Sequence, residues 1–345
     1  MPDSPVGGRP LAISMGEPAG VGPDIILQAH ASLKADPEAP PVIVFGDPSL
    51  LESRAERLGL DVAFSSLARA DDLQAGQQDA LAVVDVGRID DTPGILDEST
   101  GTVTVSALSA ALDAVRLGHC SGLVTAPIHK ANLYATGFAY PGHTEFLEAY
   151  AQEHWPQSKP LAVMMLAGPE LRTVPVTVHI PLSQVTGSLT TQRIVEVGQV
   201  VARDLKHRFG IDTPRLAIAG LNPHAGEQGS LGKEDDAIIA PAVTQLRQQG
   251  IKAVGPLPAD TMFHPEARQA FDAALCMYHD QALIPVKALD FHNTVNVTLG
   301  LPFVRTSPDH GTALSLAGTG RASPASMIAA IKLAAKMAKR ARETA

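Results

Sequence analysis

Three histidines each follow an apolar run of the chain and are the first strongly polar groups after it. They are His179 after residues 173–178, His224 after residues 215–219 and His279 after residues 273–277. Parallel strands bring their carboxyl ends to one edge of a sheet, and open α/β sheets bind ligands at that edge. Three imidazoles that converge there suit a divalent transition metal such as Zn, Co or Ni, with an open position for substrate. Spacing alone leaves open the alternative that each histidine only stabilises its own loop.

The stretch after residues 273–277 carries several further groups that could do chemistry. Asp280 follows His279 directly, and Lys287 lies eight residues beyond that histidine. A carboxylate can move a proton or bind a cation, and a lysine can hold an anion or act as a base when its surroundings depress its pKa. We therefore treat Asp280 and Lys287 as candidates for the catalytic base.

Other residues have the character of an anion-binding site. Asn296 lies between Val295 and Val297, which favours an amide that is buried or faces a cleft. Arg305 follows a short apolar run, and a buried arginine needs an anionic partner; together with Lys287 it would suit a phosphate. The alternative is two ordinary surface cations.

A helix start is predicted at residues 141–146. Thr144 can cap this helix, whose first N–H groups could bind an anion, and His143 could contact substrate or pack in the core.

Three glycine-rich segments do not match the standard nucleotide-binding motifs. Residues 16–22 follow a predicted strand but lack the G-x-G-x-x-G dinucleotide fingerprint, and residues 222–233 lack the ending of a Walker loop. A third segment, residues 309–320, contains His310, Gly311, Thr312 and Gly318. By itself it indicates a structural turn.

The composition of the 345-residue chain is that of a globular protein large enough for two domains, with 45% hydrophobic and 18% charged residues. The formal net charge of −9 argues against a nucleic-acid partner, although a few local cations could still bind a small anion. The two cysteines predict reduced thiols. We see neither a signal peptide nor an apolar run long enough to cross a membrane, so we expect a cytoplasmic protein.

Apolar runs alternate with helical patterns, which predicts a mostly parallel sheet with helices on both faces. The predicted strands cover residues 11–15, 42–45, 81–86, 123–125, 161–166, 171–178, 215–219, 273–277 and 294–298. The predicted helices cover residues 23–34, 49–58, 99–117, 144–152, 188–208, 233–248, 312–317 and 323–339. A turn at residues 167–170 predicts an antiparallel hairpin. We expect a first domain of residues 1–143 plus 305–345 and a second of residues 144–304.

With these motifs in place, the sequence resembles the 4-hydroxythreonine-4-phosphate dehydrogenase family of vitamin B6 biosynthesis. The resemblance runs over nearly the whole chain. It includes residues 15–23, Gly142–His143–Thr144–Glu145–Phe146, residues 221–227, Tyr278–His279–Asp280–Gln281, residues 298–303 and residues 305–313.

The resemblance implies a fold like that of isocitrate and isopropylmalate dehydrogenases, with two α/β/α domains and an active-site cleft between them. It implies a homodimer with a shared active site, in which the metal is held by His179, His224 and His279 and the third histidine comes from the partner subunit. The substrate contacts implied by the resemblance are His143, Thr144, Lys287, Asn296 and Arg305. By motif, Asp260 joins Asp280 as a carboxylate candidate for the catalytic base, with Lys287 as the alternative. The cofactor, NAD or NADP, would lie against residues 309–320, and the divalent metal would be Zn, Mg or Co.

The implied reaction oxidises 4-phosphooxy-L-threonine to 2-amino-3-oxo-4-phosphooxybutanoate, which loses CO2 to give 3-amino-2-oxopropyl phosphate. One departure lies at Phe291–His292–Asn293–Thr294, where members often carry Gly-Arg or Asp-Arg followed by Gly. It leaves open a related dehydrogenase of another phosphorylated hydroxy acid, such as erythronate 4-phosphate, or of an aromatic dihydrodiol. Alternatives of other classes are a metal-dependent hydrolase or lyase of a phosphometabolite, and a non-catalytic binding protein with a structural zinc.

Overall fold

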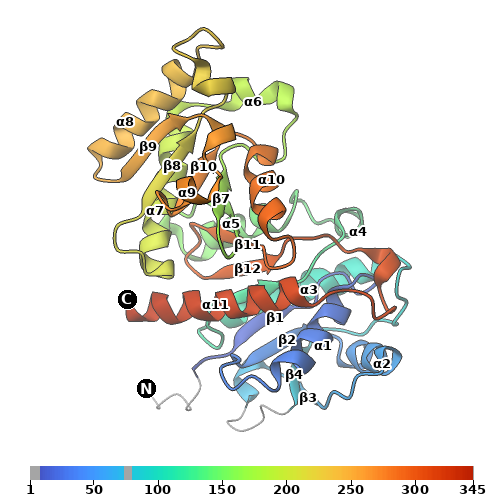
Figure 1. The fold of residues 1–345 in the computed structure, drawn as a ribbon. Helices are drawn as coiled ribbons and strands as arrows, with labels where there is room; N and C mark the ends of the chain where they lie inside the picture. Colours follow the sequence, from blue (N-terminus) through green and yellow to red (C-terminus); the bar gives the residue numbers. More distant parts are fainter. Residues whose placement is uncertain (1–7, 74–79, 345) are drawn as a thin grey trace. The chain divides into compact units, whose positions relative to one another are not determined.

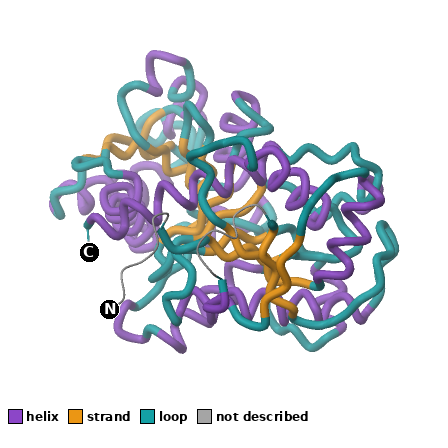
Figure 2. Tube along the Cα trace, turned by 90° about the horizontal axis from the view of Figure 1, so that it is seen from below, coloured by secondary structure: helices purple, strands orange, loops and turns teal. Residues whose placement is uncertain are grey.

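The computed structural model describes residues 8–73 and 80–344. The chain divides into two compact units, each of which contains both strands and helices (Figure 1). Unit 1 comprises Met1–Tyr150 and Pro302–Ala338, and unit 2 comprises Ala151–Leu301 and Lys339–Ala345. Within both units the strands are flanked by helices (Figure 2). A mostly parallel α/β architecture is therefore confirmed.

The described strands of unit 1 form a parallel sheet in the order β3-β4-β2-β1-β5-β12. Their bounds are β1 Leu11–Ser14, β2 Val42–Gly46, β3 Phe64–Leu67, β4 Leu81–Asp85, β5 Leu123–Thr125 and β12 Arg305–Pro308. The helices are α1 Gly22–Leu33, α2 Pro48–Leu58, α3 Glu98–Arg116 and α4 Lys130–Ala135. Two more, α5 His143–His154 and α11 Ala325–Glu343, begin in unit 1. The carboxyl ends of β5 and β12 therefore lie side by side.

The described strands of unit 2 have the order β11-β6-β7-β10-β8-β9. Their bounds are β6 Val163–Ala167, β7 Arg172–Pro175, β8 Arg215–Ala219, β9 Lys252–Leu257, β10 Ala273–Cys276 and β11 Val295–Leu299. The strand β6 is antiparallel to both of its neighbours, whereas β7, β10, β8 and β9 run parallel. The helices are α6 Leu182–Ser188, α7 Thr191–Phe209, α8 Ala240–Gln248, α9 Pro265–Arg268 and α10 His279–Leu289.

Short helical turns complete both units. The 3₁₀ turns are Ala70–Asp72, Pro156–Ser158, Pro223–Gly226, Ala259–Thr261 and Leu314–Leu316, and Asp235–Ile239 is a π-helical turn.

Several local predictions were right, and others need correction. The hairpin around residues 167–170 is confirmed, because β6 pairs with β7 in antiparallel register. The helix predicted at residues 188–208 is confirmed as α7, but it begins at Thr191, since Thr190 is extended and its Oγ1 accepts from the N–H of Arg193 to cap the helix. The helix predicted at residues 312–317 is only the turn Leu314–Leu316. The strands β3, β9 and β12 and the helices α4, α6 and α10 were not predicted.

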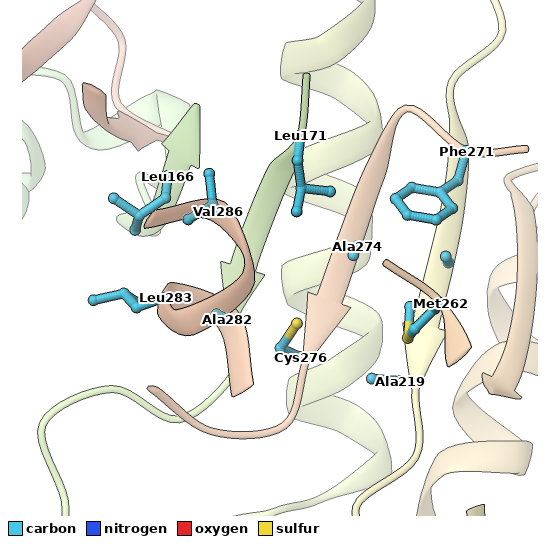
Figure 3. Packing of buried hydrophobic residues seen from close by; sticks show 11 residues of the cluster. Leu166, Leu171, Ala219, Met262, Phe271, Ala274, Cys276, Ala282, Leu283 and Val286 are labelled. Carbon is cyan, nitrogen blue, oxygen red and sulfur yellow. The ribbon is translucent and has the colours of Figure 1, made fainter. Parts of the chain in front are cut away.

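The core under the carboxyl ends of the unit 2 strands fixes the position of α10. One face of this helix packs against the sheet (Figure 3). It consists of Ala282, Leu283 and Val286, and the residues it meets are Leu166 on β6, Leu171 directly before β7 and Cys276 on β10. Burial of such apolar side chains contributes about 1.5–3 kcal/mol for each large one. The residues on the rest of α10, including His279 and Lys287, are therefore carried by a well-anchored helix.

No described helix is long and apolar enough to cross a membrane. Cys120 and Cys276 are both buried free thiols, as the sequence predicted.

Candidate functional site

The chain brings two of the three predicted metal ligands together in unit 2. The backbone that follows β7 stays beside the backbone that follows β10: the N–H of Val176 donates to the carbonyl of Cys276 at 2.8 Å, and Thr177 Oγ1 donates to the carbonyl of Met277 at 2.7 Å. As a result the ring centroids of His179 and His279 lie 5.6 Å apart. Two residues separated by 100 positions in the sequence thus become neighbours through the parallel pairing of two strands.

His279 is the first residue of α10, so the polar run after β10 forms the first turn of a helix. Its Nδ1 lies 2.7 Å from Oδ1 of Asp280, and the carboxylate is 71% exposed. Because this contact occupies Nδ1, Nε2 is the ring nitrogen left to bind a metal. Carboxylates commonly orient metal-binding histidines in this way. Asp280 therefore has an orienting contact with His279 in addition to its candidacy as a base.

His224 lies on the loop after β8, the strand next to β10 in the sheet. The loop backbone is unusual, because His224 and Ala225 have φ values of 54° and 52°. The side chain of Gln281 links this loop to the stretch that carries His279: Gln281 Nε2 donates to the carbonyl of Gly220 at 2.8 Å, and its Oε1 accepts from the N–H of Met277 at 2.6 Å.

The strand order explains why the three histidines share one edge of the sheet, but one chain does not assemble them into a metal cluster. Within residues 8–73 and 80–344, no group of three or more His, Cys, Asp or Glu side chains is placed to hold a metal ion. His179 and His224 are exposed and His279 is half-buried. The structure places His279 beside His179 of the same chain, and the assignment of all three as ligands stays a prediction.

The other residues predicted in unit 2 lie on three separate elements. Lys287 is half-buried on α10, with its Nζ 5.4 Å from the centre of the Phe291 ring. Asn296 is half-buried on β11, paired with Leu166 of β6. Asp260 is exposed on the turn Ala259–Thr261.

Unit 1 contains a second group of polar residues, at the ends of β5 and β12. Arg305 is 2% exposed, and its Nη2 donates to Thr125 Oγ1 at 2.6 Å. Burial lowers the pKa of Arg305 to about 10, which still leaves the guanidinium charged at neutral pH. A charge held on a buried strand in this way has a fixed position and direction.

His143 belongs to the same group. Burial, and secondarily the positive charges of Arg305 and Lys130, lower the pKa of His143 well below 6.5. The imidazole is therefore neutral at physiological pH, and its Nε2 is buried without a hydrogen-bond partner among the described residues. From the sequence we expected Thr144 to cap this helix. Instead, α5 begins at His143, so Thr144 lies inside the helix.

The predicted cofactor segment, residues 309–320, lies against the glycine-rich turn that follows β1. The N–H of Val21 donates to the carbonyl of Thr312 at 2.9 Å, and a Cβ on Gly20 would approach Thr312 within 3.0 Å. At the other end of the segment, the N–H of Gly318 donates to Asp24 Oδ1 at 2.7 Å. His310 Nδ1 is 3.0 Å from the carbonyl of its neighbour Gly311.

A buried ion-pair network supports this segment. Asp24 and Arg54 are both fully buried and form an ion pair, and Arg54 Nη2 also bonds Asp91 Oδ1 at 2.6 Å. Arg54 further donates to the carbonyls of Pro18 and Gly20. The network thus joins α1, α2 and the glycine-rich turn beneath residues 309–320.

Sequence reasoning missed several residues that shape these sites. They are Thr125, Lys130, Asp24, Arg54, Asp91, Asp235 and Gln281. Thr125 could have been found, because it ends a predicted strand just as the histidines follow theirs. The partners of Arg54 and Asp235 are set by long-range packing, for which the sequence has no local signal.

Comparison with known proteins assigns the family. A family model described as pyridoxal phosphate biosynthetic protein PdxA matches residues 38–334. The 4-hydroxythreonine-4-phosphate dehydrogenase of Xanthobacter autotrophicus is 50% identical over 331 residues, which cover 95% of this chain and 93% of that protein. The chain belongs to the PdxA family.

Solved structures agree with this assignment. A crystal structure of 4-hydroxythreonine-4-phosphate dehydrogenase from Klebsiella pneumoniae matches with a TM-score of 0.84 at 35% identity, covering 96% of this chain and 100% of that one. A terephthalate 1,2-cis-dihydrodiol dehydrogenase from Burkholderia xenovorans matches with a TM-score of 0.63 at 28% identity, covering 95% and 98% of the two chains.

Proposed function

We propose that this protein is an NAD(P)-linked, metal-dependent dehydrogenase that oxidises 4-phosphooxy-L-threonine to 2-amino-3-oxo-4-phosphooxybutanoate. The product then decarboxylates to 3-amino-2-oxopropyl phosphate, a step of pyridoxal phosphate biosynthesis. Membership of the family supports the proposal. The observation in the structure that carries it is the His179–His279 pair, with ring centroids 5.6 Å apart and the second imidazole oriented by Asp280.

The donor set of unit 2 fits a divalent metal. Two adjacent imidazoles, one with a carboxylate at Nδ1 and its Nε2 left to bind a metal, are the chemistry that Zn, Co or Ni prefers. We assign His179, His224 and His279 as the ligands, and Zn, Mg or Co as the ion. When bound, such an ion would stabilise negative charge on the substrate oxygen and lower the pKa of the substrate alcohol.

The cations and the neutral imidazole anchor the anionic substrate. In unit 1, Arg305 supplies a fixed guanidinium, and the neutral imidazole of His143 supplies a hydrogen bond through its Nε2. Thr144 lies in the first turn of α5, where free backbone N–H groups also favour an anion. In unit 2, Lys287 and Asn296 are assigned to the same substrate. Fixed anchors of this kind orient the reacting carbon, which contributes much of the rate.

The nicotinamide cofactor is assigned to residues 309–320, with His310, Gly311, Thr312 and Gly318 as its contacts. The support is the pairing of this segment with the glycine-rich turn after β1, and the buried Asp24–Arg54–Asp91 network that holds both. NAD(P)+ supplies the hydride acceptor.

The proton of the substrate alcohol goes to one of three residues. Asp280 is exposed and contacts His279, Asp260 is exposed on its turn, and Lys287 lies half-buried against Phe291. All three remain assigned as catalytic candidates. The contact of Asp280 with His279 gives Asp280 an orienting role in addition to its candidacy as the base.

A homodimer with a shared active site completes the proposal. Unit 2 exposes large apolar side chains on α6, on α10 and directly after α10. They are Leu182 at 69% exposed, Ile284 at 64%, Leu289 at 39% and Phe291 at 61%. Exposed apolar side chains are available for contacts with a second subunit. Light scattering measures the oligomer directly. A shared site further predicts that mixed His224→Ala and His279→Ala subunits recover activity that neither variant has alone.

The experiment that tests the activity follows the absorbance of reduced cofactor with 4-phosphooxy-L-threonine. It uses protein stripped of metal with a chelator, before and after adding back Zn, Co or Mg. We expect NADH or NADPH only after metal is restored. Phosphate release or cleavage without cofactor would instead indicate a hydrolase or lyase, and binding without turnover a binding protein. Erythronate 4-phosphate, supplied in parallel, tests whether the sequence at residues 291–294 changes the preferred substrate.

A further inference from the structure

The loop that carries His224 has a strained backbone, and the histidine is one of the strained residues. Four residues that are not glycine have left-handed φ values: His224 at 54°, Ala225 at 52°, Glu227 at 42° and Gln228 at 54°. Such conformations are uncommon for residues with a Cβ and persist only where the surroundings enforce them.

The enforcing contacts come from Asp235, which is fully buried. Its Oδ1 accepts from the N–H of Leu221 at 2.8 Å, and its Oδ2 accepts from the N–H of Asn222 at 3.1 Å and from Asn222 Nδ2 at 3.0 Å. One carboxylate therefore satisfies two consecutive backbone donors at the point where the chain leaves β8. Asp235 also begins the π-helical turn Asp235–Ile239, a deviation that occurs often near functional sites.

Two glycines allow the loop to wrap closely around this carboxylate. A Cβ on Gly220 would lie 2.8 Å from Asp235 Oδ1, and a Cβ on Gly226 would lie 3.2 Å from both Cβ and Oδ2 of Asp235. The loop before and after His224 thus contacts the same side chain. The backbone therefore lies against Asp235 on both sides of His224.

We propose that Asp235 is a positioning residue for the metal site: it holds the strained loop so that His224 is preorganised as a ligand. This inference rests on the proposed metal-dependent function. Asp235 does not contact the metal in this scheme. It acts through the backbone of residues 221–226, as outer-sphere residues do when they fix ligand geometry.

The test compares Asp235→Asn with Asp236→Asn in the full-length protein. Asp236 is adjacent, exposed and carries the same charge, so it controls for loss of one negative charge. Cobalt(II) is titrated into metal-free protein, and its visible absorption reports affinity and ligand geometry. We expect Asp235→Asn to weaken cobalt binding about 10–100-fold and to change the spectrum at saturation, with Asp236→Asn like the wild type.

Asn222→Ala provides a milder variant in case Asp235→Asn does not fold. It removes one of the three hydrogen bonds to Asp235, and we expect a smaller loss of cobalt affinity in the same direction. Unchanged affinity and spectrum in a folded Asp235→Asn protein, or in Asn222→Ala if Asp235→Asn does not fold, would overturn the inference.

Hydrogen exchange on metal-free protein separates this inference from the proposed function. We expect amides of residues 221–229 to exchange faster in Asp235→Asn than in the wild type and in Asp236→Asn. If the wild type binds no cobalt, the metal assignment fails, whereas the exchange result still decides whether Asp235 holds the loop. Equal exchange in all three proteins would refute that role.

Discussion

The polar groups of the two units are held by different kinds of structural element, a buried strand in unit 1 and exposed loops or a helix start in unit 2. In unit 1, Arg305 lies on β12 and bonds Thr125 on the adjacent β5, so strand pairing and burial fix its charge. In unit 2, His179 and His224 lie on exposed loops, and His279 on the first turn of a helix.

The difference shows what each kind of support requires. A guanidinium on a buried strand needs few additional contacts, because the sheet already determines its direction. Imidazoles on loops need other side chains to orient them: Asp280 bonds His279, Gln281 ties two loops together and Asp235 holds the His224 loop. Substitutions of these imidazoles or of the side chains that orient them should therefore act on metal binding, and substitutions of Arg305 on binding of the anionic substrate.

The largest effect is expected for His224→Ala. Loss of a metal ligand removes several kcal/mol of charge stabilisation, so turnover should fall about 1,000-fold or more, to the level of the chelated wild type. His264→Ala is the matched control, because His264 is an exposed histidine of the same unit whose ring bonds the exposed carboxylate of Glu266. Turnover is measured by cofactor reduction at saturating metal. Full activity in a metal-free His224→Ala protein would contradict the assignment.

Arg305→Lys should have the next largest effect. Lysine keeps the charge but loses the planar fork that can bind a phosphate or carboxylate through two hydrogen bonds. We expect KM for the phosphorylated substrate to rise about 10–100-fold while cobalt affinity stays unchanged. Arg69→Lys, on an exposed arginine of the same unit, serves as the control. A loss of cobalt affinity without a change in KM would reverse the roles given to the two units.

The buried His143 predicts a pH dependence of stability. Its pKa lies below 6.5 in the folded protein, mainly because of burial. As pH falls below about 6.5, the unfolded chain therefore binds a proton that the folded chain does not, and the free energy of unfolding decreases, by at most about 1.4 kcal/mol per pH unit from this group. Denaturant unfolding at pH 7.5 and 5.5 should show a smaller loss for His143→Gln than for the wild type. Parallel losses in both proteins would show that His143 does not contribute.

The smallest effect is expected at the contact between Lys287 and Phe291. The Nζ of Lys287 lies 5.4 Å from the ring centre, and the ring is 61% exposed, so the interaction contributes about 0.5–1 kcal/mol. Phe291→Leu keeps apolar area but removes the ring, and KM should rise about 2–5-fold. A change in the preferred substrate without a change in KM for 4-phosphooxy-L-threonine would instead assign Phe291 to specificity.

The architecture and the positions of the histidines after their strands could be predicted from the sequence, because both follow from the local pattern of apolar and polar residues. Apolar runs that end in polar residues located the ends of β7, β8 and β10. The helix α10 was missed, since its first turn is polar and Pro285 lies inside it. The buried partners of Arg54 and the strained loop at His224 depend on contacts between distant segments, and no periodicity encodes them.

The most direct test of the central claim, that the imidazoles of unit 2 hold the metal, is anomalous diffraction at the zinc absorption edge from crystals grown with zinc. We predict one strong peak bounded by the imidazole nitrogens of His179, His224 and His279. The same map would show whether these histidines come from one subunit or two. If the protein binds zinc stoichiometrically in solution but the peak lies away from these three histidines, the assignment of the three histidines as metal ligands is wrong.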